Sequence, residues 1–274
     1  WKIVAQDGIT VGSGGWEIAE PLQSSFPCEL GHIVLGTAPQ QAPQSVTLHV
    51  EVTAGALLWR NQWPLWIYPR PQFDPSAALL YDPIVALDAE WCTYATPIST
   101  KDLLGRPMPP VVVATVLDDA VRRLLRCGGR VLLLQTGAVP LPSLRVPFWR
   151  EAIKLLVPHV LWRRFPHAGF ADLQFFGLAS DVAFDTGRLT AALPELVAWT
   201  PILRRLDARQ FTLADYVFSA EFAADSDAAP NGRLLACALR LQGGAGAQPT
   251  GLQCNVAGQY LLGELLQLLQ SEVF

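Results

Sequence analysis

The stretch Val111–Thr136, VVVATVLDDAVRRLLRCGGRVLLLQT, decides the fold of this chain. Val111–Val116 is a short apolar run rich in β-branched residues, which predicts a strand buried on both faces. Asp118 can cap the helix that follows, and the pair Gly128-Gly129 can end it. Arg130–Thr136 then returns as a second apolar strand. Because a strand, helix, strand crossover joins parallel strands, this unit predicts an α/β domain built on a parallel sheet.

The same stretch contains little that indicates catalysis. In parallel sheets, ligands bind beyond the carboxyl ends of the strands. Here those ends lie around Leu117-Asp118 and Gln135–Val139, where the sequence has no nucleophile, glycine fingerprint or metal-ligand pair. The pattern therefore predicts the fold clearly but gives little indication that the protein is an enzyme.

Composition bounds the class of protein. The chain has 274 residues, of which 51% are hydrophobic and 16% are charged, and its net charge is -4. A length of this order suits one large domain or two ordinary ones, and the acidic balance argues against a nucleic-acid binder. No apolar run is long enough for a transmembrane helix. We expect a soluble protein, bacterial and either cytoplasmic or secreted, and its first residue, Trp1, suggests a processed product, an engineered fragment or a piece of a larger polypeptide.

The sequence changes character near the proline-rich stretch PRPQFDP at Pro69–Pro75. Before it, Ser45–Thr53 alternates polar and apolar residues as a half-buried strand does, and Leu57–Trp59 and Trp63–Tyr68 predict two further strands. Residues 1–72 are therefore predicted to form a small immunoglobulin-like β-sandwich that is incomplete. Residues 73–274 are predicted to form the α/β domain.

Within residues 73–274 we expect alternating strands and helices. Strands are predicted at Ala78–Tyr81, Leu173–Phe176, Val197–Arg204, Asp215–Ala223 and Arg233–Leu241, the last two as antiparallel neighbours. Helices are predicted at Pro147–Leu156 and Val256–Leu269.

Three segments together resemble a known family. Asn61–Pro69 (NQWPLWIYP) looks like the N-x-W-x-L-W-v-Y-P ending of the immunoglobulin-like sandwich in bacterial glycoside hydrolases of the family 2 type. Phe165–Phe176 (FPHAGFADLQFF) is similar to a later stretch of the same region. Gly232–Leu235, with the closing helix, resembles the end of that region.

The resemblance spans nearly the whole chain and implies an accessory region. It would consist of an immunoglobulin-like module and a flavodoxin-like or amidotransferase-like α/β domain with a mostly parallel sheet. The catalytic glutamates of the family lie on a separate barrel that this sequence does not match. The resemblance thus implies a non-catalytic module that binds carbohydrate such as a polysaccharide, or that supports a catalytic barrel or a homo-oligomer. No cofactor, membrane partner or nucleic-acid partner is expected.

Carbohydrate sites combine a flat aromatic surface with planar polar side chains. The predicted carbohydrate-binding residues that meet this description are Trp149, Trp162, His167, Asp172 and Gln174. The alternative for each is a structural role, in which the tryptophans pack against the sheet and the polar groups fix a loop.

Catalytic and metal-binding alternatives have weaker patterns. A glycoside hydrolase would need two carboxylates across a cleft, for which the candidates are Asp82, Asp88, Glu90 and Asp172. The five cysteines are scattered and lack metal-ligand spacing. His159 and His167 flank Trp162, but the sequence offers no third metal ligand beside them. No catalytic residue and no metal site are therefore predicted.

Overall fold

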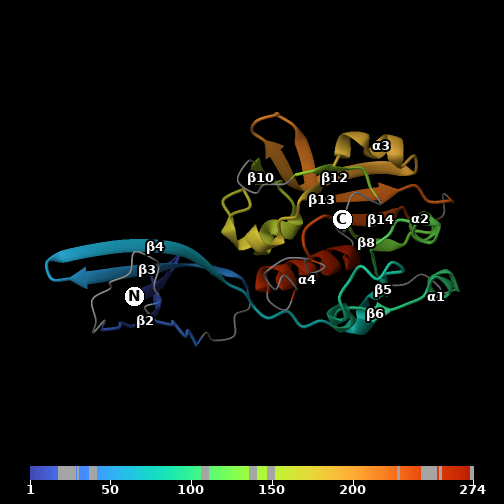
Figure 1. The fold of residues 1–274 in the computed structure, drawn as a ribbon. Coiled ribbons are helices and arrows are strands. Elements are labelled where there is room, and N and C mark those ends of the chain that lie inside the picture. The colour runs from blue at the N-terminus through green and yellow to red at the C-terminus, as the bar shows by residue number, and fades with distance from the viewer. Residues whose placement is uncertain are drawn as a thin grey trace. The chain divides into compact units, whose positions relative to one another are not determined.

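The chain forms two compact units. The computed structural model describes residues 1–17, 29, 31–36, 42–105, 111–135, 141–146, 152–226, 229–241, 252 and 255–271. The first unit comprises Trp1–Pro69 and Arg164–Pro166, and the second comprises Arg70–Arg163 and His167–Phe274 (Figure 1). The change of unit at Pro69 falls just before the boundary predicted at residue 72.

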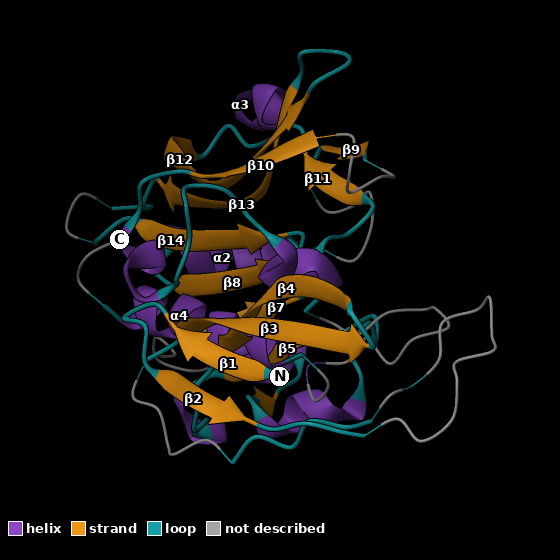
Figure 2. Cartoon of the chain, turned by 90° about the vertical axis from the view of Figure 1, so that its left-hand side faces the viewer, coloured by secondary structure: helices purple, strands orange, loops and turns teal. Residues whose placement is uncertain are grey.

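The first unit contains one antiparallel sheet in the order β2-β1-β3-β4. Its strands are β1 (Lys2–Ala5), β2 (Thr10–Ser13), β3 (Gln44–Ala54) and β4 (Leu57–Ile67) (Figure 2). β3 and β4 pair without a break from Gln44 opposite Ile67 to Ala54 opposite Leu57. The prediction of two separate strands at Leu57–Trp59 and Trp63–Tyr68 was wrong, because this pairing keeps the polar residues between them extended as well.

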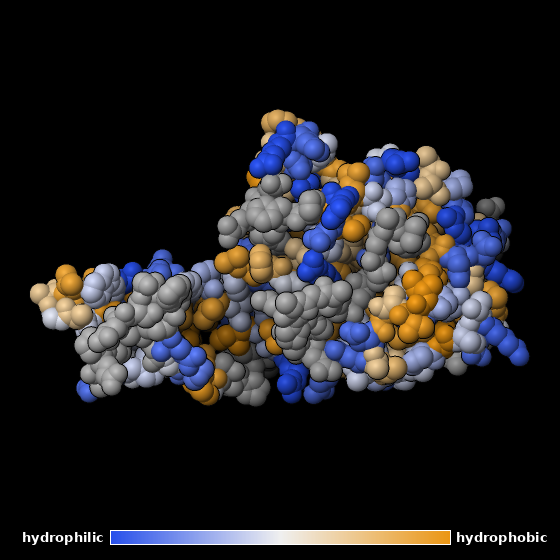
Figure 3. Space-filling view, viewed as in Figure 1, coloured by the Kyte–Doolittle hydropathy of each residue, from blue (hydrophilic) through white to orange (hydrophobic). Residues whose placement is uncertain are grey.

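The β3–β4 hairpin exposes apolar side chains near its turn. Gly55, with φ +61°, makes the two-residue turn, as hairpins of this kind require at that position. Near the turn, Leu57 and Trp59 are 61% and 53% exposed, and hydrophobic residues appear at the surface there in Figure 3. Among the described residues of this unit we find a single sheet. The immunoglobulin-like sandwich therefore stays a prediction.

The second unit is built on a mixed sheet of ten strands among the described residues. Five of them are parallel and lie in the order β6-β5-β7-β8-β14, while β10, β12 and β13 continue the sheet in antiparallel fashion. The prediction of an α/β domain with parallel strands is confirmed. The prediction of a mostly parallel sheet was wrong, because β10–β13 add an antiparallel half. The strands of the main path are β5 (Leu79–Tyr81), β6 (Thr96–Pro97), β7 (Val112–Ala114), β8 (Arg130–Leu134), β10 (Ala152–Leu156), β12 (Leu196–Asp207), β13 (Leu213–Phe222) and β14 (Gly232–Cys237).

The deciding stretch forms the unit that its sequence predicts. β7 and β8 are parallel neighbours, and α2 (Asp119–Arg126) connects them. The Asp118 carboxylate caps α2 by accepting a hydrogen bond from the Val121 amide at 3.0 Å. Gly128, with φ +84°, ends the helix. α2 buries Val121 and Leu125 against one face of β7, β8 and β14.

α4 (Val256–Gln270) covers β8 and β14 from the other face. Residues alternate between the two faces of a strand. The residues of β8 and β14 that pack with α2, among them Leu133 and Ala236, belong to one core cluster. α4 contacts the same two strands but contributes no residue to that cluster, so it packs on the opposite face of the sheet. The helix predicted at Val256–Leu269 is confirmed, with Tyr260, Leu261, Leu265 and Leu268 buried.

Gly232 allows β14 to begin directly beside α2. A Cβ built at this position would lie 2.1 Å from the backbone oxygen of Leu125. Only glycine fits so close an approach between a strand and a helix end.

Two predicted elements have the wrong type. Ala152–Leu156 is strand β10 rather than part of a helix, because it pairs antiparallel with β12 from Ala152–Asp207 to Leu156–Leu203; residues 147–151 lie outside the described part. Leu173–Phe176 begins the 3-10 helix η5 (Leu173–Leu178) rather than a strand, because the Asp172 side chain caps it. Pairing with a distant strand decides the first case, and a local side-chain cap decides the second.

The remaining elements connect the sheet. Other predicted strands are confirmed, since Ala78–Tyr81, Val197–Arg204, Asp215–Ala223 and Arg233–Leu241 contain or overlap β5, β12, β13 and β14. Among the described residues, no helix has both the length and the apolar character needed to cross a membrane. The shorter elements are η1 (Pro75–Ala77), η2 (Ala89–Thr93), α1 (Thr100–Gly105), β9 (Ser143–Arg145), η4 (Val160–Arg164), β11 (Val182–Phe184), η6 (Thr186–Arg188) and α3 (Leu189–Ala192).

Candidate ligand-binding site

At the carboxyl ends of the parallel strands, the described polar side chains bond to other groups of the protein, and residues 136–140 lie outside the described part. Asp118 caps α2 and also accepts a hydrogen bond from the Tyr81 hydroxyl at 2.7 Å. Gln135, which is 3% exposed, exchanges two hydrogen bonds with the backbone of Leu141 at 3.0 and 3.1 Å. The polar groups at this edge of the sheet therefore hold the fold together, and the search for a site moves to β10.

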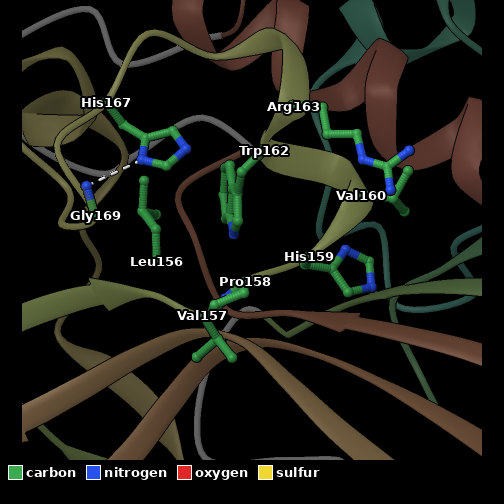
Figure 4. A pocket seen from close by; sticks show the side chains of 9 residues that line it. All are labelled: Leu156, Val157, Pro158, His159, Val160, Trp162, Arg163, His167 and Gly169. Atoms are coloured by element: carbon green, nitrogen blue, oxygen red, sulfur yellow. Dashed lines mark hydrogen bonds between the residues drawn. The ribbon is translucent and has the colours of Figure 1, made fainter.

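A pocket of about 550 Å³ lies where the chain leaves β10. The chain turns through η4 and returns beside the strand, where the Leu156 amide donates to Gly169 at 3.0 Å and the Ala171 amide donates to Lys154 at 2.7 Å. These bonds close residues 157–168 into a loop that surrounds the pocket (Figure 4). The lining residues are Leu156, Val157, Pro158, His159, Val160, Trp162, Arg163, His167 and Gly169.

Trp162 lines the pocket but belongs to the core of the second unit. Its side chain is 2% exposed, and its indole N–H donates to the backbone oxygen of Ile202 at 3.0 Å. Its ring meets Phe175 edge-on, with centroids 5.9 Å apart. A face so enclosed does not offer the open stacking platform proposed from the sequence. Trp162 instead shapes one wall.

The two histidines of the pocket are also held by hydrogen bonds with the backbone. The Nδ1 atom of His159 accepts a hydrogen bond from the Leu161 amide at 3.2 Å, and Nδ1 of His167 accepts from the Gly169 amide at 3.0 Å. An imidazole that accepts at Nδ1 carries its proton on Nε2. Burial lowers the pKa of His159, which favours this neutral form. Both rings therefore keep an Nε2–H donor for another partner.

The other predicted site residues lie elsewhere. Asp172 accepts from the Gln174 amide at 3.1 Å and caps η5, and burial raises the pKa of its carboxyl. Gln174 is 8% exposed. Neither residue lines the pocket, and Trp149 lies outside the described residues. The structure therefore brings Trp162 and His167 together, and it gives Asp172 and Gln174 the structural role that the sequence left open.

Sequence reasoning missed two polar members of this pocket. His159 and Arg163 line it, although neither was among the predicted site residues. The position of His159 and His167 on either side of Trp162 in the sequence is the signal that could have found the pocket. To recognise the pocket from that signal, one would have to know that a hydrogen bond joins Leu156 and Gly169.

Three of the carboxylates considered for glycoside hydrolysis accept hydrogen bonds within the protein, whereas Asp88 precedes η2 without a side-chain cap bond. Asp82 accepts hydrogen bonds from the Leu87 amide at 2.9 Å and from the Thr115 hydroxyl at 2.7 Å. Glu90 accepts from the Tyr94 hydroxyl at 2.7 Å. No Asp or Glu is among the residues that line the β10 pocket. The residues that line this pocket therefore do not supply the pair of carboxylates that glycoside hydrolysis requires.

Thiol and metal chemistry find no better support in the described part of the chain. Burial raises the pKa of the Cys237 thiol to about 12, which keeps it protonated and unreactive. Cys92 and Cys127 are exposed. Among the described residues, no three His, Cys, Asp or Glu side chains gather as metal ligands.

Lys154 on β10 is buried beside another cation, which leads to a prediction. It is 3% exposed and lies opposite Arg205, which is 5% exposed. Burial and the charge of Arg205 lower the pKa of Lys154 to about 8, whereas an unfolded lysine titrates near 10.4. Between these values the unfolded chain binds more protons, so this group makes stability rise with pH from about 8 to about 10.4.

We therefore expect Lys154→Met to stabilise the protein at pH 7 by on the order of 1–3 kcal/mol, because the charge no longer has to be buried. The gain should shrink as the pH rises from 8 to 10. Urea unfolding of both proteins across this range, followed by circular dichroism, measures the difference. A constant difference from pH 7 to 10 would contradict the lowered pKa.

No family model, curated protein or solved structure matches this chain. What the protein does must therefore be inferred from the chemistry of its own residues.

Proposed function

We propose that this chain is a non-catalytic carbohydrate-binding module associated with a glycoside-hydrolase-type protein, and that the β10 pocket takes the sugar. The composition of the pocket carries this proposal. Its volume of about 550 Å³ falls in the range of about 300–1,000 Å³ that is usual for small-molecule sites. It combines an apolar wall with hydrogen-bond donors, and its lining residues include no acid/base pair.

The strand order supports the finer fold assignment that this proposal uses. Numbered along the chain, the parallel strands β5, β6, β7, β8 and β14 lie in the order 2-1-3-4-5. This is the order of flavodoxin-like sheets. We therefore propose a flavodoxin-like domain with an antiparallel extension, and an immunoglobulin-like origin for the first unit. The structural roles of Asp118 and Gln135 suit a domain of this type that has no catalytic role.

A glycan-binding screen on the full chain tests the proposal. We expect weak binding to at least one oligosaccharide, and loss of most of that binding in His167→Ala, because this variant removes an exposed donor without touching the core. His32→Ala is the matched control, since His32 is exposed and lies outside the pocket. Binding would be measured by titration calorimetry or by ligand-observed NMR.

If no glycan in the screen binds, the carbohydrate function is wrong. The architectural role would then be the reading to pursue, and light scattering on the full chain would show whether it forms a homo-oligomer. Equal loss of binding in His32→Ala and His167→Ala would place the sugar outside the β10 pocket.

A further inference from the structure

We propose that the β10 pocket selects an acidic saccharide, whose carboxylate is held by Arg163 and the Nε2–H group of His159, while the Nε2–H group of His167 binds the other end of the sugar ring. This inference rests on the proposed function and adds the chemical class of the ligand. It follows from which hydrogen-bonding groups the pocket offers and which it lacks.

The polar side chains that line the pocket are donors. The Nδ1 acceptors of His159 and His167 are already used by backbone amides, so each ring has only its Nε2–H left to offer. The Trp162 indole N–H is used by Ile202. Arg163 adds a guanidinium with five N–H donors and a permanent positive charge.

No lining side chain remains as an acceptor. The pocket contains no carboxylate, amide or hydroxyl side chain among its lining residues. A neutral sugar presents hydroxyl groups that both donate and accept, and its hydroxyl protons would find no side-chain partner here. A carboxylate only accepts hydrogen bonds. A sugar that carries one is therefore the better match to two imidazole donors and a guanidinium.

The placement of the three cationic or donor groups suits one ligand. Figure 4 shows the Trp162 indole between the His167 ring on one side and the side chains of His159 and Arg163 on the other. The second ring nitrogen of His167 turns away from Gly169 and toward Trp162 in the same view. A sugar ring over this wall would have donors at both ends.

Arg163 is positioned to bind such a ligand. Its side chain is exposed, and within the described part of the chain no ion pair or hydrogen bond occupies its guanidinium. Arginine binds carboxylates through two parallel N–H···O bonds, which makes it specific as well as attractive. Asp172, the acidic residue among the predicted site residues, does not line the pocket and so does not compete with a bound carboxylate there.

The test compares acids with their neutral counterparts on the full chain. Oligosaccharides of galacturonic, glucuronic and mannuronic acid are titrated at low salt, each beside its methyl ester, which keeps the shape and removes the charge. Neutral glycans, sodium acetate and sodium sulfate form further arms. We expect at least one acid to bind about tenfold or more tightly than its ester, because a charge-assisted hydrogen bond contributes more than a neutral one.

Two variants test whether the preference for acids over esters arises in the β10 pocket. Arg163→Ala should weaken binding of the acid by about tenfold or more while leaving binding of the ester nearly unchanged. Arg123→Ala is the matched control, because Arg123 is an exposed arginine on α2 that does not line the pocket. It should leave both affinities unchanged.

Each contrary outcome has a separate meaning. If esters or neutral glycans bind as tightly as the acids, the acidic specificity is wrong and the proposed carbohydrate function stands. If acetate or sulfate binds as tightly as the uronates, the pocket recognises an anion alone and the saccharide part of this inference is wrong. If no saccharide of any kind binds, both the inference and the proposed function fail.

Discussion

Trp162→Ala is expected to lower the free energy of unfolding of the second unit by about 3–5 kcal/mol, the usual cost of removing a buried tryptophan side chain. The residue is 2% exposed, so truncation leaves a cavity beside Phe175, whose ring it contacts edge-on. It also leaves the Ile202 oxygen without its indole donor. Urea unfolding followed by far-ultraviolet circular dichroism measures the loss.

Two further variants separate the causes. Trp162→Phe retains a ring but lacks the N–H, so we expect it to cost less than the alanine variant. Phe211→Ala is the control for an aromatic side chain outside the core, since Phe211 is 84% exposed, and its effect should be small. If Trp162→Ala unfolds at the same urea concentration as the wild type, Trp162 is not the core residue that its burial indicates.

This expectation bears directly on how binding should be tested. A protein that has lost about 3–5 kcal/mol retains only part of an ordinary stability of about 5–15 kcal/mol. Loss of sugar binding in Trp162→Ala could then reflect partial unfolding. The exposed residues His167 and Arg163 are the better probes of the pocket.

Asp215→Ala is expected to destabilise the second unit by about 3 kcal/mol or more, because it breaks a buried ion pair from one side. The Asp215 carboxylate is fully buried. Arg204 donates to it from Nε at 2.8 Å and from Nη2 at 3.2 Å, and the Thr186 hydroxyl donates to it at 2.8 Å. The variant leaves the guanidinium and the hydroxyl without their acceptor.

The position of Asp215 explains why the effect should spread. Asp215 lies on β13 opposite both Arg204 of β12 and Phe184 of β11. Its backbone pairs with both strands, and its carboxylate joins β13 to β12 and to the η6 turn that carries Thr186. We expect hydrogen exchange to accelerate in β11 and β12 of the variant, and not only next to the substitution.

An exposed ion pair supplies the control for this prediction. Asp181 pairs with Arg240 at 3.3 Å, but the Asp181 side chain is 59% exposed. Exposed pairs contribute about 0–1 kcal/mol, so Asp181→Ala should change stability little. The double variant Arg204→Leu with Asp215→Leu should recover part of the loss, because it leaves no unpaired charge. Equal effects of Asp215→Ala and Asp181→Ala would refute the structural importance of the buried pair.

The sequence predicted the candidate site only in part. Two of the predicted site residues, Trp162 and His167, line the β10 pocket, and their binding of a ligand stays a prediction. Asp172 and Gln174 also have the planar polar groups of a sugar site, but hydrogen bonds within the η5 cap occupy them. Composition cannot distinguish a polar group that is free to bind from one that is used by the backbone.

What the sequence alone determined is the parallel half of the second unit. The apolar runs of β7 and β8, the Asp118 cap and the glycines after α2 are local signals: the cap and the glycines act within a few positions, and β7 and β8 pair across the single helix between them. The closing helix α4 is determined in the same way, by an apolar stripe that needs only a sheet to cover it. Local propensity and burial agree in these elements, so the pattern suffices.

What only the tertiary structure decided is the strand β10 and the pocket beside it. Ala152–Leu156 has no strand pattern of its own, and its conformation depends on pairing with β12, about fifty residues later in the chain. The pocket in turn exists because Leu156 and Gly169 are joined by a hydrogen bond, which brings His159, Arg163 and His167 around one wall. Contacts between distant residues are set by packing and hydrogen bonding in three dimensions, and no local pattern records them.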